Sequence, residues 1–329
     1  MVKSNLVSIS VGYPMPLQII LKNTQNVASP SPFQQMLQLE ASEINSVLPS
    51  STPQVASDFH NIRFKYNYSY IPAWLESINN GVATIWVNIP VSIPANSSIT
   101  IDMEVDPSLN FDGNYWGEAP QLSSTYAQYD NGASIFPYYQ PWGSLSSLPN
   151  NWAPASTSQG QTINYASTYT EITVPSTGGW YGIYLYPTPS SLVSTNTVWE
   201  FYGNRYTTSY GYIGTNTGPN FGYYQGYNFF EQSSTPIIYL GVNGYYTYAS
   251  TGYVDTNTNK VYTMQMNSAT SLQMFINYSQ ILSVTGIPAQ SPNSFQIGIG
   301  HSSQPFYIYW LRTRALSPNG VMPSVEVIA

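Results

Sequence analysis

The sequence lacks cysteine and is poor in charge. Its 329 residues include no Cys, 8 Lys plus Arg and 15 Asp plus Glu, so charged residues make up 7% of the chain, against roughly 25% in an ordinary soluble domain. Without Cys the chain can form neither a disulfide framework nor a thiolate metal site. With so few cations it cannot build a nucleic-acid-binding surface by neutralising phosphates.

Two kinds of hydrophobic segment are also missing. No stretch of about 18 apolar residues is present that could span a membrane. The first ten residues, Met1 to Ser10, alternate like a strand and contain no apolar region of a secretory signal peptide. We therefore expect no membrane span, and we expect the protein to leave its cell inside a particle unless its N-terminus has been trimmed.

What the chain does have is polar but uncharged. It contains 30 Tyr, 25 Pro and 23 Gly, its hydrophobic fraction is 42%, and its formal net charge is −7. The hydrophobic fraction is enough for a large core, so the low charge does not indicate disorder. A surface of Tyr, Ser, Thr, Asn and Gln binds water without depending on ionisation, which suits an acidic exterior. The composition therefore favours an extracellular or virion-surface location.

Short alternating or apolar segments bounded by Pro, Gly and Asn occur along the whole chain and predict strands. The clearest are 17–21, 82–89, 98–105, 169–174, 197–202, 237–242, 261–266, 272–277, 295–299 and 306–311. Residues 34–45 predict a strand followed by a short helical turn, and no long helix is expected. Many short strands at regular spacing predict an all-β fold of two β-sandwich, jelly-roll-like domains.

A Pro- and Ser-rich stretch from Pro137 to Pro154 marks a domain boundary, because the composition changes there to a region rich in Tyr, Gly and Thr. We place the division near residue 145. The predicted domains are residues 1–145 and residues 146–329.

Asn or Asp followed by Gly favours hairpin turns, here at Asn80-Gly81, Asp112-Gly113, Asn131-Gly132 and Asn243-Gly244. The alternating segment 255–259 favours a turn over a Ca²⁺ loop, because it lacks the Gly and the distal Glu of an EF-hand.

Several phrases, in a fixed order, carry a resemblance to a known family. They are Pro32–Met36, Ile62–Phe64, Ile71–Glu76, Ala83–Val87, Ile93–Ala95, Ser98–Ile101, Gly117–Tyr126, Tyr129–Phe136 and Tyr309–Pro323. Together they resemble domain of unknown function 2341, which occurs in surface and virus proteins of thermoacidophilic archaea. The resemblance implies a first β-sandwich followed by a jelly roll of concanavalin A or laminin-G type. No activity is implied by it.

The same phrases contain a pair of cations and several large apolar side chains. Arg312 and Arg314 are two residues apart on a predicted strand and so share one face. An ion pair with Glu76, Asp130 or Glu118 would make them a brace between strands or domains, and recognition of an anionic ligand is the alternative. The side chains expected to bury the most apolar area are Ile71, Trp74, Ile85 and Trp86.

The feature most typical of an enzyme is the run from Asp102 to Asp106. Asp102, Glu104 and Asp106 are at i, i+2 and i+4 of a predicted strand and project from one face. Paired carboxylates about 5–9 Å apart serve glycoside hydrolysis, and the run is similar to the acidic strand of jelly-roll glucanases, although its spacing and domain differ. Adjacent carboxylates repel unless a cation intervenes. We favour a solvated or Ca²⁺-bound strand end. We expect no cofactor, apart from a Ca²⁺ ion for which these three residues are the candidate ligands.

Aromatic residues crowd the second predicted domain and provide rigid amphipathic contact area for sugars or proteins. The alternative interpretation is that Tyr replaces charged residues as the polar cover of the sheets. The candidate ligand-binding residues are Trp180, Tyr184, Tyr210, Tyr223, Tyr224 and Tyr246.

These observations predict a non-catalytic structural or adhesion protein, a subunit of an archaeal virus surface such as a spike, fibre or turret. We expect it to bind host cell-surface glycan or protein, to contact other virion or appendage subunits, and to form a homo-oligomer, because particle subunits often assemble symmetrically. We expect no nucleic-acid partner. The alternatives are a secreted carbohydrate-active enzyme and a cell-surface or appendage module with a concanavalin-like fold.

Overall fold

The computed structural model describes residues 17–154, 162–173, 180–186, 196–205, 210–216, 226–232, 235–291, 294–300 and 305–328. In these ranges the chain is almost entirely β-structure, which confirms the all-β prediction. The described helices are short: α1 (Ala41–Val47), α2 (Gly132–Ile135) and a 3-10 turn (Pro318–Gly320). The predicted strand and helical turn at 34–45 correspond to β2 and α1.

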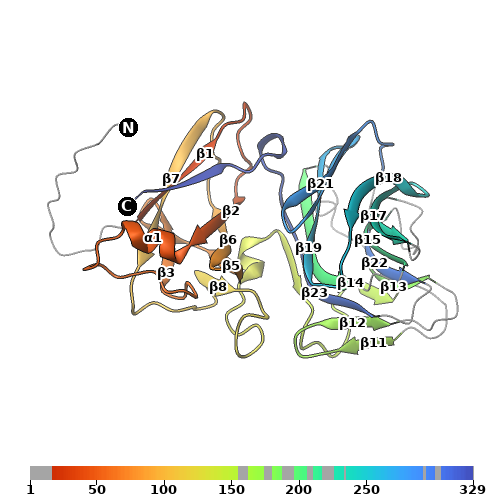
Figure 1. The fold of residues 1–329 in the computed structure, drawn as a ribbon, viewed down its shortest axis with the longest axis horizontal. Coiled ribbons are helices and arrows are strands. Elements are labelled where there is room, and N and C mark those ends of the chain that lie inside the picture. The colour runs from red at the N-terminus through yellow and green to blue at the C-terminus, as the bar shows by residue number, and fades with distance from the viewer. Residues whose placement is uncertain are drawn as a thin grey trace.

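The first sandwich consists of two sheets (Figure 1). Its outer sheet has the order β24 (Ser324–Ile328), β1 (Leu17–Asn23), β7 (Ser97–Val105), β3 (Ile62–Tyr66) and β4 (Ser69–Ile71). Its inner sheet has the order β2 (Phe33–Glu40), β6 (Val82–Ile89), β5 (Ala73–Asn79) and β8 (Trp116–Glu118). The pairing of β5 with β8 is parallel, and the other pairings described for this sandwich are antiparallel.

The second sandwich is built from two sheets whose described pairings are all antiparallel. The sheet facing the first sandwich has the order β11 (Thr162–Tyr165), β12 (Thr170–Thr173), β23 (Phe306–Ala315), β14 (Thr197–Arg205), β19 (Lys260–Ser268), β20 (Ser271–Ile276) and β21 (Ser279–Thr285), and β9 (Tyr138–Pro141) also pairs with β23. The far sheet has the order β10 (Trp152–Pro154), β13 (Trp180–Leu185), β22 (Ser294–Gly300), β15 (Tyr210–Asn216), β16 (Tyr227–Gln232), β17 (Thr235–Val242) and β18 (Tyr245–Val254).

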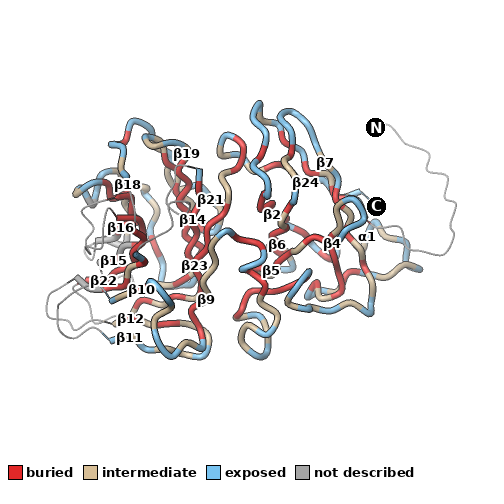
Figure 2. Tube along the Cα trace, turned by 180° about the vertical axis from the view of Figure 1, so that it is seen from behind, coloured by how far each residue is buried: buried red, intermediate tan, exposed pale blue. Residues whose placement is uncertain are grey.

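The four sheets follow one another along the long axis of the molecule (Figure 1) and enclose three apolar layers. One layer fills each sandwich. The third lies between the sandwiches, where Trp74 and Trp86 of the first meet Val261 and Trp310 of the second. Figure 2 shows buried chain on both sides of this junction. The interface between the two sandwiches therefore has its own apolar core, and we call this interface the seam.

The seam exists because strands of the inner sheet are buried on both faces. Along β5, Ala73 and Leu75 point into the first sandwich, while Trp74 and Glu76 point toward the second. Strand residues alternate between faces, so a strand with apolar side chains at successive positions is covered on both sides. The four predicted core residues are all buried, Ile71 to 4% exposure and Trp74, Ile85 and Trp86 to 0%.

Two strands belong to the opposite sandwich from the one to which a boundary at residue 145 would assign them. Strand β9, which precedes the boundary, pairs with β23 of the second sandwich. Strand β24, at the C-terminal end of the described chain, returns to the first sandwich and pairs with β1. A single division at residue 145 leaves both exchanges out, because pairing of strands distant in sequence has no signal in local composition.

Two of the four predicted hairpin turns are present. Asn80-Gly81 joins β5 to β6, and Asn243-Gly244 joins β17 to β18, with positive φ at both residues of each turn. The prediction was wrong for Asn131-Gly132, which begins α2, and for Asp112-Gly113, which lies in a loop before β8. Asp112 Oδ1 accepts the N–H groups of Asn114 and Trp116, whereas Asn131 Nδ2 donates to the backbone oxygens of Ala73 and Asn114, which are distant in sequence.

Candidate functional site

The structure describes only part of the predicted aromatic site. Tyr184 lies on β13, half-buried, opposite Gln296. Register places Trp180 and Tyr210 on either side of Gly300, on two neighbours of β22. The side chains of Trp180, Tyr210 and Tyr246 and the whole of Tyr223 and Tyr224 lie outside the described residues. The prediction that these residues bind a ligand therefore stays a prediction.

The three acidic residues of β7 and its end do share the solvent side of the outer sheet, but they are used separately. Glu104 forms an ion pair with Lys65 at 3.0 Å and accepts the hydroxyl of Tyr70 at 2.7 Å. Asp106 accepts the hydroxyl and the backbone N–H of Ser108. Among the described residues no group of three His, Asp or Glu side chains is placed to hold a metal ion. Ca²⁺ binding by Asp102, Glu104 and Asp106 stays a prediction, and the geometry does not favour it.

The predicted cation pair lies at the centre of the molecule. Arg312 Nη2 donates to Glu76 Oε2 at 2.6 Å, and Arg312 Nε donates to Glu200 Oε2 at 2.7 Å. Arg314 Nε donates to the second oxygen of Glu200 at 3.0 Å. Glu76 belongs to the first sandwich and Glu200 to the second, so Arg312 bridges them. The prediction of a brace that includes Glu76 is thus confirmed, whereas Asp130 and Glu118 are not the partners.

Each carboxylate of this cluster is surrounded by donors. Glu76 accepts the indole N–H of Trp86 at 2.8 Å and the hydroxyl of Tyr278 at 2.6 Å. Glu200 also accepts the hydroxyl of Thr263 at 3.3 Å. Hydrogen bonding of this kind is what allows an ion pair to be buried at all, because an unpaired buried charge is very costly. We call the group formed by Glu76, Glu200, Tyr278, Arg312 and Arg314 the seam cluster.

Aromatic rings close around the guanidinium of Arg312. Its central carbon is 4.4–5.2 Å from the ring centroids of Trp74, Trp86, Phe136 and Trp310. Ring faces carry negative electrostatic potential and attract a cation, by about 2 kcal/mol or more where water is excluded. Arg312 Nη1 has no hydrogen-bond acceptor among the described residues. The faces of these four rings therefore stabilise the part of the guanidinium that has no hydrogen bond.

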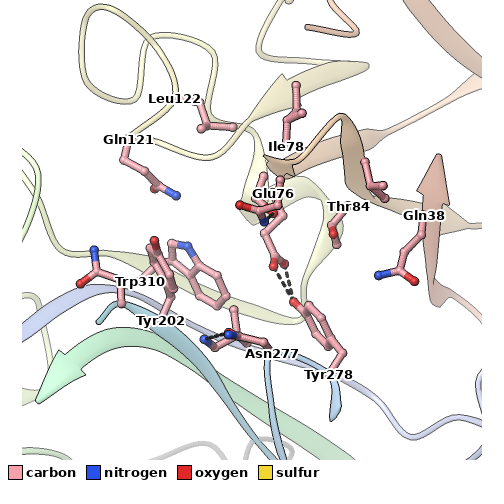
Figure 3. Close-up of a pocket in the computed structure, with 15 residues that line it drawn as sticks. Gln38, Glu76, Ile78, Thr84, Gln121, Leu122, Tyr202, Asn277, Tyr278 and Trp310 are labelled. Carbon is pink, nitrogen blue, oxygen red and sulfur yellow. Dashed lines mark hydrogen bonds between the residues drawn. The ribbon is translucent and has the colours of Figure 1, made fainter. Parts of the chain in front are cut away.

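A pocket of about 540 Å³ opens beside the seam cluster, between the two sandwiches (Figure 3). We call it the seam pocket. Its buried floor includes Glu76, Val261 and Trp310. The remaining lining residues are Gln38, Ser77, Ile78, Asn79, Val82, Thr84, Gln121, Leu122, Tyr202, Asn259, Asn277 and Tyr278. The size lies within the ~300–1,000 Å³ of small-molecule sites. Among the described residues the lining is polar and includes one charged group, Glu76.

A β-bulge shapes one wall of the seam pocket. Tyr202 pairs with Trp310 and Gly203 with Ile308, so Tyr309 is an extra residue in β23. Tyr309 and Trp310 both lie against the ring of Tyr202, with centroid distances of 5.2 and 5.4 Å. A side chain at Gly203 would collide with the carbonyl of Tyr307, since its Cβ would lie 2.3 Å from that oxygen. Glycine is therefore required at the bulge.

Burial and the surrounding hydrogen bonds and charges shift the pKa values of acidic groups near the seam in opposite directions. Burial raises the pKa of Asp130, although this carboxylate accepts bonds from Gly132, Trp74 and Tyr139. Burial likewise raises the pKa of Glu118. For Glu200 burial acts the same way, but Arg312 and Arg314 more than offset it and lower the pKa below its usual range.

These shifts predict an acid-tolerant protein. A carboxyl whose pKa is higher in the folded than in the unfolded protein binds its proton at a higher pH in the folded state. Protonation of Asp130 and Glu118 therefore increases the stability of the folded protein as pH falls toward about 4. The contribution of Glu200 is present above about 4 and is lost only as pH falls through its lowered folded pKa. Urea unfolding followed from pH 7 to 2 should show stability level or rising down to about pH 4. A steady decline over that range would contradict the prediction.

Sequence reasoning missed Glu200 and the pocket lining. A lone acid inside the apolar segment from Thr197 to Tyr202 was a usable signal, because such a residue must find a buried cation. No comparable signal marks Gln121, Asn259 or Tyr278, which come from loops and turns far apart in the sequence.

Comparison with known proteins provides one sequence relative. The chain is 40% identical over 164 residues to uncharacterized protein 562 of Sulfolobus islandicus rod-shaped virus 1. The match spans 46% of this chain and 27% of that protein, so the chain covers little more than a quarter of its curated relative. No family model matches the chain. The resemblance to domain of unknown function 2341 therefore stays a prediction.

Solved structures with related folds share little sequence. The carbohydrate recognition domain of Emp47p is 12% identical, with a TM-score of 0.41 over 54% of this chain and 95% of that one. The Bacillus licheniformis β-glucanase is 14% identical, with a TM-score of 0.40 over 54% and 97%. In the described part of the chain, no helix has the length and apolar character needed to cross a membrane.

Proposed function

We propose that the chain is a non-catalytic structural or adhesion subunit exposed on the surface of an archaeal virus particle, where it attaches to host-surface glycan or protein. The observation that carries the proposal is the bridging of both sandwiches by the fully buried Arg312. Because Arg312 joins the two sandwiches, the subunit would hold its attachment surface at a constant distance from the particle. It would also carry mechanical force from one sandwich to the other. The virus-encoded relative supports the viral setting.

The arrangement of charge supports exposure to an acidic exterior. Of the eight Lys and Arg residues, five form described ion pairs with carboxylates: Arg63, Lys65, Lys260, Arg312 and Arg314. Four of these five are buried, Lys65 being the exception. Attachment through the uncharged polar and aromatic residues of the surface would depend on hydrogen bonds and aromatic contacts and would respond weakly to salt.

The engaged carboxylates support a non-catalytic role. Glu76 and Glu200 are both held by Arg312, and Glu76 also accepts bonds from Trp86 and Tyr278. Glycoside hydrolysis needs one carboxyl free to donate a proton and a second free to attack or activate water. Neither carboxylate of the seam cluster has that freedom.

The proposal is tested on purified virus particles and host cells. Antibodies against the chain should label the outside of intact particles, and the purified protein should bind host cells and compete with particles for attachment. Light scattering should give a mass above one chain if the subunit assembles as a homo-oligomer. Absence from particles together with failure to compete would overturn the proposal. Release of reducing sugar from host polysaccharide by the purified protein would overturn its non-catalytic part.

A further inference from the structure

The tripeptide Asn-Tyr-Ser forms two hairpin turns of the same shape, residues 67–69 between β3 and β4 and residues 277–279 between β20 and β21. The φ angles are 48° and 66° at Asn67 and Tyr68, and 47° and 65° at Asn277 and Tyr278. A two-residue turn with positive φ at both positions favours Gly at the second one, where a side chain is strained. Tyr occupies that unfavourable position in both turns.

At the turn between β20 and β21, the Tyr side chain makes an interface contact. The hydroxyl of Tyr278 donates to Glu76 of the first sandwich at 2.6 Å and accepts from Arg312 at 2.8 Å. The ring of Tyr278 lies 6.0 Å from that of Trp86. This turn therefore presents a Tyr side chain to a neighbouring β-sandwich.

The matching turn at Tyr68 faces solvent. Strand β4, which follows the turn, is the edge strand of the outer sheet and lies farther from the second sandwich than β5 and β6 (Figure 2). The side chain of Tyr68 is 94% exposed. A large aromatic side chain is thus held outside the molecule by the same turn that elsewhere joins two sandwiches.

An open pocket of about 530 Å³ adjoins Tyr68, and we call it the edge pocket. Its lining residues are Pro32, Tyr66, Asn67, Ser69, Tyr70, Ile71, Pro72, Asn88 and Pro90. Three proline rings make its walls suited to an aromatic side chain, and no charged residue is among the described residues that line it. The exposed side chains of Asn67 and Ser69 can bond a phenol hydroxyl. Since pockets of ~300–1,000 Å³ hold whole small molecules, a Tyr ring can enter this one.

Tyr68 and the edge pocket belong to one surface patch, because both chain neighbours of Tyr68 line the pocket. A two-fold axis beside the turn would place Tyr68 of each copy in the pocket of the other, which is the self-complementary arrangement of an isologous dimer. A host receptor would need only a projecting side chain or only a pocket. The presence of both in one patch favours a second copy of this chain.

The area and charge of the patch fit such a contact. The rings of the partly exposed Tyr70 and Tyr115 lie 5.5 Å apart and extend the patch. With Tyr68 they would remove roughly 300 Å² per copy from water, a large part of the ~800 Å² per copy of a standard interface. The charged groups beside Tyr70 are Lys65 and Glu104, which pair with each other at 3.0 Å. The patch therefore brings no unpaired charge of these two residues into the contact.

We propose that the turn between β3 and β4 is a contact between two copies of this chain, in which Tyr68 of each copy fills the edge pocket of the other. This inference rests on the homo-oligomer expected under the proposed function and names the surface through which it forms.

The test measures the mass of the intact protein by sedimentation equilibrium over a wide concentration range. We expect a dimer with a dissociation constant on the order of 10 µM or tighter. Tyr68→Gly suits the positive φ, should unfold in urea no more easily than the parent, and should weaken the dimer at least about tenfold. Ser69→Glu should weaken it similarly, because two carboxylates would face each other across the axis. Tyr245→Ala removes a Tyr that is 70% exposed on β18 and is the matched control.

A second measurement locates the contact. A photoreactive benzophenone side chain in place of Tyr68 should cross-link to peptides that contain Pro32, Pro72 or Pro90 of an isotope-labelled second copy.

The outcomes separate this inference from the proposed function. A dimer that Tyr68→Gly and Ser69→Glu weaken and Tyr245→Ala retains, with cross-links into the edge pocket, supports the contact. A monomeric parent, or a dimer that both variants retain, overturns the contact and leaves host attachment standing. If Tyr68→Gly retains the dimer but competes poorly for host cells, the turn contacts the host and this inference is wrong. The attachment function falls only if particle labelling and competition fail.

Discussion

Replacing Arg312 by methionine should lower the free energy of unfolding by about 3–5 kcal/mol, the cost of leaving a buried charge without its partner. The substitution leaves Glu76 and Glu200 buried without the guanidinium that joins them. It also removes the cation around which four aromatic rings are packed. Urea unfolding followed by tryptophan fluorescence at pH 7 measures the loss.

Two further variants isolate the cause. Lys22→Met changes a cation on the exposed face of β1 and should alter stability by less than about 0.5 kcal/mol. Combining Arg312→Met and Arg314→Met with Glu76→Gln and Glu200→Gln removes all four charges and should recover much of the loss, because the penalty comes from unpaired charge rather than from missing attraction. If the four-fold variant is no more stable than Arg312→Met alone, the electrostatic explanation is wrong.

Replacing Trp74 by alanine should cost about 3–5 kcal/mol, as large-to-small changes of buried aromatics do. Trp74 is 0% exposed, and it lies edge-on to Phe136, Tyr139 and Trp310 at centroid distances of 5.5–5.9 Å. The cavity would open inside the seam, where the sandwiches meet. Thermal and urea unfolding of the purified variant measure the effect.

A conservative change at the same position separates packing from hydrogen bonding. Trp74→Phe keeps most of the apolar contact but removes the indole N–H that donates to Asp130 at 2.9 Å. We expect a smaller loss of about 1–3 kcal/mol at pH 7, the cost of removing a donor from a buried charged acceptor. The loss should shrink in acid, because protonation of Asp130 relieves its need for that donor. A loss that is the same at pH 7 and pH 4 would contradict this assignment.

Most cations whose side chains the structure describes are buried in this protein, which is unusual. Ordinary soluble proteins place Lys and Arg on the surface, whereas here Arg63, Lys260, Arg312 and Arg314 are buried in ion pairs. Lys260 pairs with Asp255 at 2.8 Å at the turn between β18 and β19, which agrees with the expectation that residues 255–259 form a turn. Charge thus holds the interior together, and uncharged polar side chains cover much of the outside.

Much of the fold was predictable because it follows from local patterns. Alternating and apolar segments located strands such as β1, β6 and β7, and Asn80-Gly81 located a hairpin. The pattern was insufficient at Asn131-Gly132, where the chain begins a helix. It was also insufficient at the bulge in β23, where one extra residue turns Tyr309 and Trp310 to the same side. A bulge depends on the partner strand, which local sequence does not specify.

The sequence by itself determined the all-β class, the exclusion of thiolate and phosphate-neutralising sites, and the importance of Arg312 and Arg314 as two of eight cations. These follow from composition and from the two-residue period of strands. Only the tertiary structure decided that Glu200 is the shared partner, that β24 returns to the first sandwich, and that Gln121, Asn259 and Trp310 line one pocket. Those facts depend on which strands and loops pack against one another across the seam. That packing is determined by the burial energy of the whole chain rather than by any local segment.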